Sequence, residues 1–267
     1  MKRKINYKGL EKGFSLVEMA VVIVILGFII GVLLLPLQVQ RENTFRLQTE
    51  NQLENARKAL IGFAQANGYL PCPATSNGTG VFPDDRGVAN ASNTSACAQQ
   101  KGFLPAVTLG IQPTDQEGFA VDGWGNRIFY AITQVNSSGG AVTPDFTTPY
   151  EMANVGISGL NPDLRVCESG DPATGITATS CSPLPNEANY LINNAVAVIY
   201  STGATAQQGA GGAHENENLN AVLNVDNVFV SRDVSVATTA SEEFDHIVVW
   251  LSPYVLYNAM VAAGQLR

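Results

Sequence analysis

The sequence predicts an α+β protein: a long N-terminal helix, first transmembrane and then amphipathic, packs on an antiparallel β-sheet head with a short C-terminal helix. Three observations predict this class. Residues 14–37 are almost wholly apolar, residues 45–64 repeat apolar side chains at spacings of three and four, and short β-branched and aromatic segments follow residue 70. Apolar runs of ~20 residues and 3.6-residue periodicity are typical of helices, and short β-branched segments between turn formers are typical of strands.

Charge is distributed unevenly along the chain. Residues 1–13 carry five basic side chains and Glu11, a net +4, and the whole chain carries −8, so the remainder carries −12. A basic start before an apolar run is expected to stay cytoplasmic, which predicts export of the C-terminal bulk. The acidic remainder argues against general nucleic-acid binding, because phosphate contacts need Lys and Arg.

The apolar run is longer than that of a cleaved secretory signal, and it contains a carboxylate, Glu18. A carboxylate in hydrocarbon costs at least a few kcal/mol, so Glu18 needs a compensating partner. Residues 14–37 are therefore expected to be a transmembrane helix that Pro36 kinks or locally unwinds. Residues 38–68 are its amphipathic continuation, which Gly68 is expected to end.

The basic leader is followed by the hexapeptide GFSLVE, residues 13–18. This stretch resembles the prepilin signature of the type IV pilin and type II secretion pseudopilin family. The resemblance implies that a membrane aspartyl peptidase removes the leader 1–13 by cutting between Gly13 and Phe14, and that Phe14 is then N-methylated. It also implies a pilin-like exported head over residues 69–267.

The same resemblance implies assembly roles for Glu18 and Pro36, although Pro36 lies one residue further along than the family's usual proline. In a bundle of such helices, Glu18 of one subunit is expected to meet the α-ammonium of Phe14 of a neighbour. Two charges that are each unfavourable alone become tolerable together, so the pair would set the axial register. The alternative is a glutamate that reaches the headgroups near the helix end.

Four segments of the head are predicted strands, and the last segment is a predicted helix. The strands are 127–135, 195–202, 227–231 and 245–252, and the helix is 253–266, with Pro253 near its start.

The stretch DGWGN, residues 122–126, resembles one that introduces the first strand of the sheet in secretion-type pseudopilins. Trp124 is expected to pack on the core, with its flanking glycines allowing a tight turn. A structural rather than a catalytic role is expected for Asp122 and Trp124.

The cysteines predict two disulfides. They form no CxxC pair and have no nearby histidine, which argues against zinc, and an even number in an exported domain favours disulfides over free thiols. Three connectivities are open, of which the sequence-local pairs are favoured: Cys72 with Cys97, and Cys167 with Cys181.

No enzymatic activity, cofactor or metal site is expected. The chain lacks HExxH, GxSxG, Walker A and GxGxxG motifs, and its histidines are His214 and His246. In residues 211–220, Glu215, Glu217 and several asparagines near His214 offer oxygens for Ca²⁺, but they match no EF-hand spacing, so a solvated loop is favoured. Other acidic residues are too scattered to define a site: Asp84, Asp85, Asp115 and Glu117.

The resemblance implies a structural subunit, a minor pilin or pseudopilin, of a type IV pilus-like filament. Its partners would be other pilin or pseudopilin subunits, the prepilin peptidase, an inner-membrane assembly platform and the membrane itself. Its location would be the inner membrane, as a single-pass protein, and then a periplasmic or extracellular filament.

Three alternatives remain open. The chain could belong to the piston of a type II secretion system, or it could be a binding module at a pilus tip, such as an adhesin or DNA-uptake receptor. An exported enzyme anchored by a pilin-like helix would require His214 or His246 to converge with carboxylates in a deep pocket.

Overall fold

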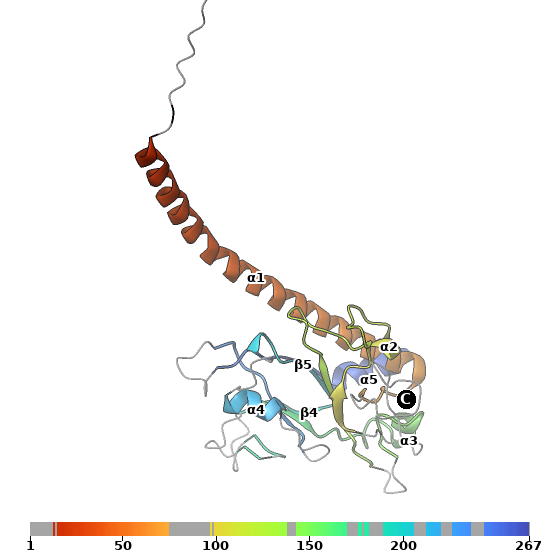
Figure 1. Ribbon diagram of the computed structural model, residues 1–267. Coiled ribbons are helices and arrows are strands. Elements are labelled where there is room, and N and C mark those ends of the chain that lie inside the picture. Colours follow the sequence, from red (N-terminus) through yellow and green to blue (C-terminus); the bar gives the residue numbers. More distant parts are fainter. Residues whose placement is uncertain are drawn as a thin grey trace, which may run out of the picture. The chain divides into compact units, whose positions relative to one another are not determined.

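The computed structural model divides the chain into two compact units, Met1–Thr44 and Phe45–Arg267. Figure 1 shows the helices and strands along the chain. Asp84 and Asp85 lie outside the described residues. The structure describes residues 13, 15–74, 97, 99–137, 143–169, 176–177, 179–181, 189–205, 212–219, 226–235 and 243–266, with only the backbone at 32–38.

The first helix, α1, spans Leu16–Asn67 and contributes to both units. Its backbone is helical throughout, so the local unwinding expected at Pro36 is absent from these residues. Among the described residues, no helix has both the length and the apolar character that a membrane crossing requires. The apolar part of α1 with described side chains, residues 16–31, is shorter than the ~20 residues of a typical span. These findings correct two predictions, the transmembrane first helix of the fold and the single-pass inner-membrane location.

The second half of α1 packs on the head through one stripe of side chains. Leu53, Ala56, Leu60 and Ala64 are at most 1% exposed. Their spacing of three and four places them on one face of the helix, as the sequence predicts. The helix ends where expected: Gly68 has φ +80° and donates its N–H to the Ala64 carbonyl at 2.8 Å.

The larger sheet is antiparallel, in the order β1-β2-β5-β7. Three of its strands fall inside predicted strand segments, whereas β1 is a three-residue KGF strand without a β-branched signal. The strands are β1 (Lys101–Phe103), β2 (Phe129–Ile132), β5 (Ala197–Ser201) and β7 (Ile247–Leu251).

A second sheet, in the order β4-β3-β6, is not predicted as a separate sheet. It consists of β3 (Leu164–Cys167), β4 (Tyr190–Ala195) and β6 (Val228–Val230), of which the sequence predicts only β6. The pair β3–β4 is antiparallel, but β3–β6 is parallel, so the pairing is not wholly antiparallel.

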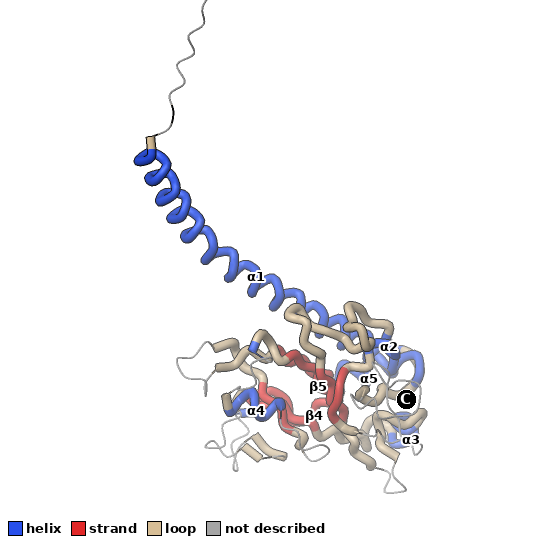
Figure 2. The backbone as a smooth tube through the Cα atoms, viewed as in Figure 1, coloured by secondary structure: helices blue, strands red, loops and turns tan. Residues whose placement is uncertain are grey.

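Strand β5 is the centre of the fold, since all five of its side chains are buried. Ile199 belongs to a core formed with α1 and with α5 (Pro253–Ala262). Its neighbours Val198 and Tyr200 belong to a second core shared with β3 and β6. The larger sheet therefore lies between α1 and α5 on one side and the second sheet on the other (Figure 2).

The remaining helices are short: α2 (Ala106–Leu109), α3 (Glu151–Val155) and α4 (Ala213–Leu219). The C-terminal helix α5 begins at Pro253, as predicted, and ends before the predicted residue 266. One side-chain hydrogen bond joins it to α1, from Gln65 Nε2 to the Ala259 carbonyl, and a second joins the segment after α5 to α1, from Gln265 Nε2 to the Gln65 carbonyl, both 3.1 Å.

The DGWGN stretch is the joint between α1 and β2. Asp122 is 3% exposed, and its Oδ1 accepts hydrogen bonds from the N–H groups of Trp124 and Asn126 at 2.9 and 2.8 Å. Its Oδ2 accepts one from the Ser201 hydroxyl. Burial raises the Asp122 pKa above its usual value, against these hydrogen bonds. These hydrogen bonds hold the loop in place.

Two residues of this loop contact α1 directly. The Gly123 N–H donates to Thr49 Oγ1 at 2.9 Å, and its Cα lies so close to α1 that a Cβ would overlap the Phe45 carbonyl. Trp124 is half-buried and lies edge-on to the Phe45 ring, with centroids 6.3 Å apart, rather than within the core clusters.

The two favoured disulfides are confirmed. Cys72 pairs with Cys97, with Cα atoms 5.3 Å apart, and Cys167 pairs with Cys181, with Cα atoms 5.5 Å apart. No free thiol remains, and all four cysteines belong to the described residues.

Gly123→Ala is expected to lower the free energy of unfolding by about 1–3 kcal/mol, because the added methyl group meets the α1 backbone, which cannot move aside cheaply. Gly62→Ala is the matched control. Gly62 lies within α1 with no atom within 4 Å of a Cβ, so the same change should stabilise by up to about 1 kcal/mol. Denaturant unfolding of both variants measures the difference in the free energy of unfolding. Equal effects would contradict the close contact that we describe between Gly123 and α1.

Replacing Cys167 and Cys181 together by Ser is expected to lower stability by about 3 kcal/mol, because a crosslink across 14 residues no longer restricts the unfolded chain. The corresponding Cys72 and Cys97 double variant, across 25 residues, should lose a few tenths of a kcal/mol more. Thermal unfolding of each variant beside the oxidised parent tests this order. An unchanged midpoint in either would show that its bridge does not limit stability.

Candidate functional site

The predicted processing site lies where the described chain begins. Gly13 is exposed, and a Cβ at this position would meet nothing within 4 Å. Phe14 and residues 1–12 lie outside the described residues. Cleavage between Gly13 and Phe14 therefore stays a prediction. Of the two residues, the structure describes Gly13, which is accessible.

Glu18 lies in the first turn of α1, where it caps the helix. Its Oε2 accepts a hydrogen bond from the Ser15 N–H at 2.9 Å, and Ser15 Oγ accepts one from the Val17 N–H at 3.3 Å. This reciprocal pattern is that of a capping box, and a carboxylate here also interacts favourably with the helix dipole. Within one chain, Glu18 thus has a local partner, Ser15, which was not predicted from the sequence. The pattern S-x-x-E at residues 15–18 is nevertheless a known sequence signature of a helix N-terminus.

The N-terminal part of α1, residues 16–30, exposes its apolar side chains on every face. Between residues 16 and 30, each large apolar side chain is 46% to 86% exposed. A helix that is apolar all round is normally buried against other elements. The exposed members are Leu16, Val17, Met19, Val21, Val22, Ile23, Val24, Ile25, Leu26, Phe28, Ile29 and Ile30.

The segment predicted as a solvated loop, residues 211–220, instead contains the helix α4. Its Asn218 is fully buried, donates from Nδ2 to the Val230 carbonyl at 2.9 Å, and accepts at Oδ1 from the Val230 N–H at 2.7 Å. The Asn218 carbonyl accepts from Tyr200 Oη at 2.8 Å and from Lys101 Nζ at 2.5 Å. These partners come from β1, β5 and β6, so the prediction fails because the polar side chains of α4 are satisfied inside the fold.

The Ca²⁺ set considered for this segment is not brought together. His214 instead lines an open cavity of about 560 Å³ with Glu168, Arg232 and Asp233. Burial raises the pKa of Glu217 to about 7, and nearby Asp226 adds to this rise, which Lys101 opposes.

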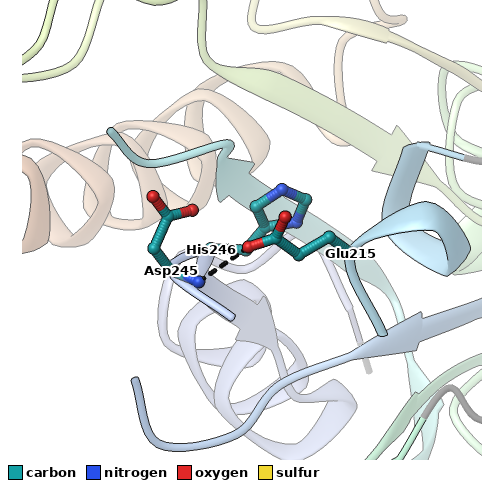
Figure 3. Close-up of side chains that lie close together, drawn as sticks. All are labelled: Glu215, Asp245 and His246. Atoms are coloured by element: carbon teal, nitrogen blue, oxygen red, sulfur yellow. Dashed lines mark hydrogen bonds between the residues drawn. The ribbon is translucent and has the colours of Figure 1, made fainter. Parts of the chain in front are cut away.

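A different three-residue cluster forms between α4 and the start of β7 (Figure 3). Glu215, Asp245 and His246 each offer one ligand atom, and these atoms lie within 4.8 Å of one another. The Asp245 N–H donates to Glu215 Oε1 at 2.8 Å. Glu215 is 1% and His246 3% exposed, whereas Asp245 is partly exposed.

Burial dominates the electrostatics of this cluster. It raises the Glu215 pKa to about 7, and the negative charges of Asp245 and Glu243 add to the rise. It lowers the His246 pKa to about 4, with a further contribution from the positive charge of Lys101. The imidazole is therefore neutral at pH 7, the form in which histidine binds metals.

Two of the scattered carboxylates share a cation. Arg127 Nε lies 2.7 Å from Asp115 Oδ2, and its Nη2 lies 2.7 Å from Glu117 Oε2. The guanidinium also lies 4.2 Å from the centre of the Phe119 ring. These ion pairs stabilise the turn before β2, and both carboxylates are paired with Arg127.

No family model, curated protein or solved structure matches the chain in the three comparisons with known proteins.

Proposed function

We propose that the protein is a prepilin-type structural subunit that joins a type IV pilus-like filament through the N-terminal part of α1. The observation that carries this proposal is the all-round exposure of apolar side chains over residues 16–30. Such a surface is removed from water when several copies of the same helix pack together. The hexapeptide at residues 13–18 and the accessible Gly13 add support.

In this proposal, cleavage after Gly13 creates the new α-ammonium of Phe14. Helices then bundle, and Glu18 of one subunit pairs with that ammonium on another. The capping hydrogen bond uses one carboxylate oxygen, Oε2, and is compatible with a second partner for the group. Apolar packing supplies the attraction between helices, and the charge pair selects one axial register.

A pseudopilin of a type II secretion system is the second candidate. It is favoured by the DGWGN stretch, residues 122–126, which docks β2 on α1 through Gly123 and Thr49. The two candidates share processing and helix packing, and they differ in the machine that uses the subunit.

Mass spectrometry of the mature protein tests the processing step. We expect a mass that begins at an N-methylated Phe14, both in sheared filaments and in the cell-associated pool. The relative amounts then distinguish a minor component from a bulk subunit. A mature protein that retains residues 1–13 would contradict the proposal.

Substitutions at Glu18 separate the two roles of its carboxylate. Glu18→Gln keeps a side-chain oxygen for the Ser15 N–H but removes the charge, whereas Glu18→Ala removes both. We expect cleavage to continue in both variants and filament incorporation to fall at least ~10-fold in both, as the loss of a buried ion pair predicts. Co-sedimentation with sheared filaments measures incorporation. Normal incorporation of Glu18→Gln would mean that the charge of Glu18 is not needed for assembly and that the residue acts only as a helix cap.

A further inference from the structure

We propose that Glu215, Asp245 and His246 form a binding site for a divalent transition-metal ion, with Zn²⁺ as the best-fitting ion, that ties α4 to the start of β7. The proposal concerns the head alone and does not rest on filament assembly. Its geometric basis is the convergence of two carboxylates and an imidazole, with ligand atoms within 4.8 Å of one another. An ion bound at ~2.0–2.2 Å holds its ligands within ~4.4 Å of each other. Side-chain shifts of roughly 1 Å would therefore close the site.

A second observation points to a missing ligand. Asp245 Oδ1 is buried and has no hydrogen-bond partner among the described residues. The other oxygen, Oδ2, accepts from the Thr205 N–H at 2.8 Å. A buried carboxylate oxygen without a partner is strongly unfavourable, and a cation is one of the few groups that satisfies it. Asp245 is also the least buried of the three residues.

The two carboxylates are held together by the fold. The Asp245 N–H fixes Glu215 Oε1, and the N–H of Thr205 fixes Asp245 Oδ2. Two carboxylates at this spacing repel each other whenever both are ionised, and Glu215 is only 1% exposed. A dication between them converts that repulsion into attraction.

The donor set selects the class of ion. Ca²⁺ prefers six to eight oxygen ligands, whereas Zn²⁺ accepts a mixed set of imidazole nitrogen and carboxylate oxygen with low coordination number. A buried histidine beside two carboxylates therefore favours Zn²⁺, with Mn²⁺ as the next candidate.

The hydrogen bonding of His246 gives the proposal a specific consequence. Asn218 Nδ2 lies 3.1 Å from His246 Nδ1, and the Asn218 amide orientation is fixed because it also pairs with both backbone groups of Val230. The ring therefore accepts at Nδ1 and carries its proton on Nε2 when no ion is bound. Binding through Nε2 moves that proton to Nδ1, so the tautomer of His246 must change, and the hydrogen bond from Asn218 Nδ2 is lost because both nitrogens are then donors.

The experiment uses the full chain without a histidine tag, freed of metal by a chelator and titrated with Zn²⁺, Mn²⁺ or Ca²⁺ in a calorimeter. We expect saturable binding of Zn²⁺ and a higher unfolding temperature with Zn²⁺ that a chelator reverses. Glu215→Gln should weaken binding more than ~10-fold, because one ligand loses its charge. Glu217→Gln is the matched control on the same helix, and it should leave binding unchanged because Glu217 lies outside the cluster.

The ring nitrogens of His246 provide a readout in the unsubstituted protein, which does not depend on a variant that folds. We expect their NMR shifts to change from the Nε2–H to the Nδ1–H pattern as Zn²⁺ is added. Absence of saturable Zn²⁺ binding overturns the proposal. So does binding of Ca²⁺ in preference to Zn²⁺, or stabilisation by acid alone, which would mean that the carboxylates share a proton instead.

Discussion

The burial of one stripe of α1 against the larger sheet is the constraint on which the head depends. Leu53 and Leu60 are fully buried in the same core as Ile199 of the central strand. Each such side chain contributes about 1.5–3 kcal/mol when removed from water. This packing places the joint loop within reach of the helix backbone, and it explains why a glycine occupies position 123. Leu256 and Met260 of α5 belong to the same core.

The second sheet is joined to the first by aromatic packing and by a buried polar network. The Tyr200 ring of β5 lies next to the Phe229 ring of β6, with centroids 5.8 Å apart, and its hydroxyl reaches the carbonyl of Asn218. Lys101 donates to the same carbonyl, and its Nζ lies 5.1 Å from the centre of the Phe229 ring. Burial lowers the Lys101 pKa to about 8. Polar groups so deep in a protein are tolerated only when they are paired, so α4 is held firmly although its sequence is hydrophilic.

The sequence predicts those parts of the fold that rest on local signals. Strands β2, β5, β6 and β7 are rich in β-branched and aromatic residues, Gly68 and Pro253 mark helix ends, and both disulfides join neighbouring cysteines. The features that the sequence did not predict depend on contacts between segments far apart in the chain. The parallel pairing of β3 with β6 joins segments distant in the chain. The cluster at Glu215 includes Asp245 from another segment, and no spacing rule links the two residues.

In the filament that we propose, Glu18 would have a local partner first and an intermolecular partner later. Within one chain, the Glu18 carboxylate accepts a hydrogen bond in the first turn of α1, so it has a hydrogen-bond partner even without a second subunit. Capping also orients the side chain, which lowers the entropy lost when a second donor binds. In a bundle, the surrounding apolar side chains exclude water and strengthen any charge pair that Glu18 forms. Because an unpaired carboxylate would be strongly unfavourable there, the proposed bundle would be stable only where it brings a cation to this position, and a helix surface without other specific contacts would thereby acquire a defined register.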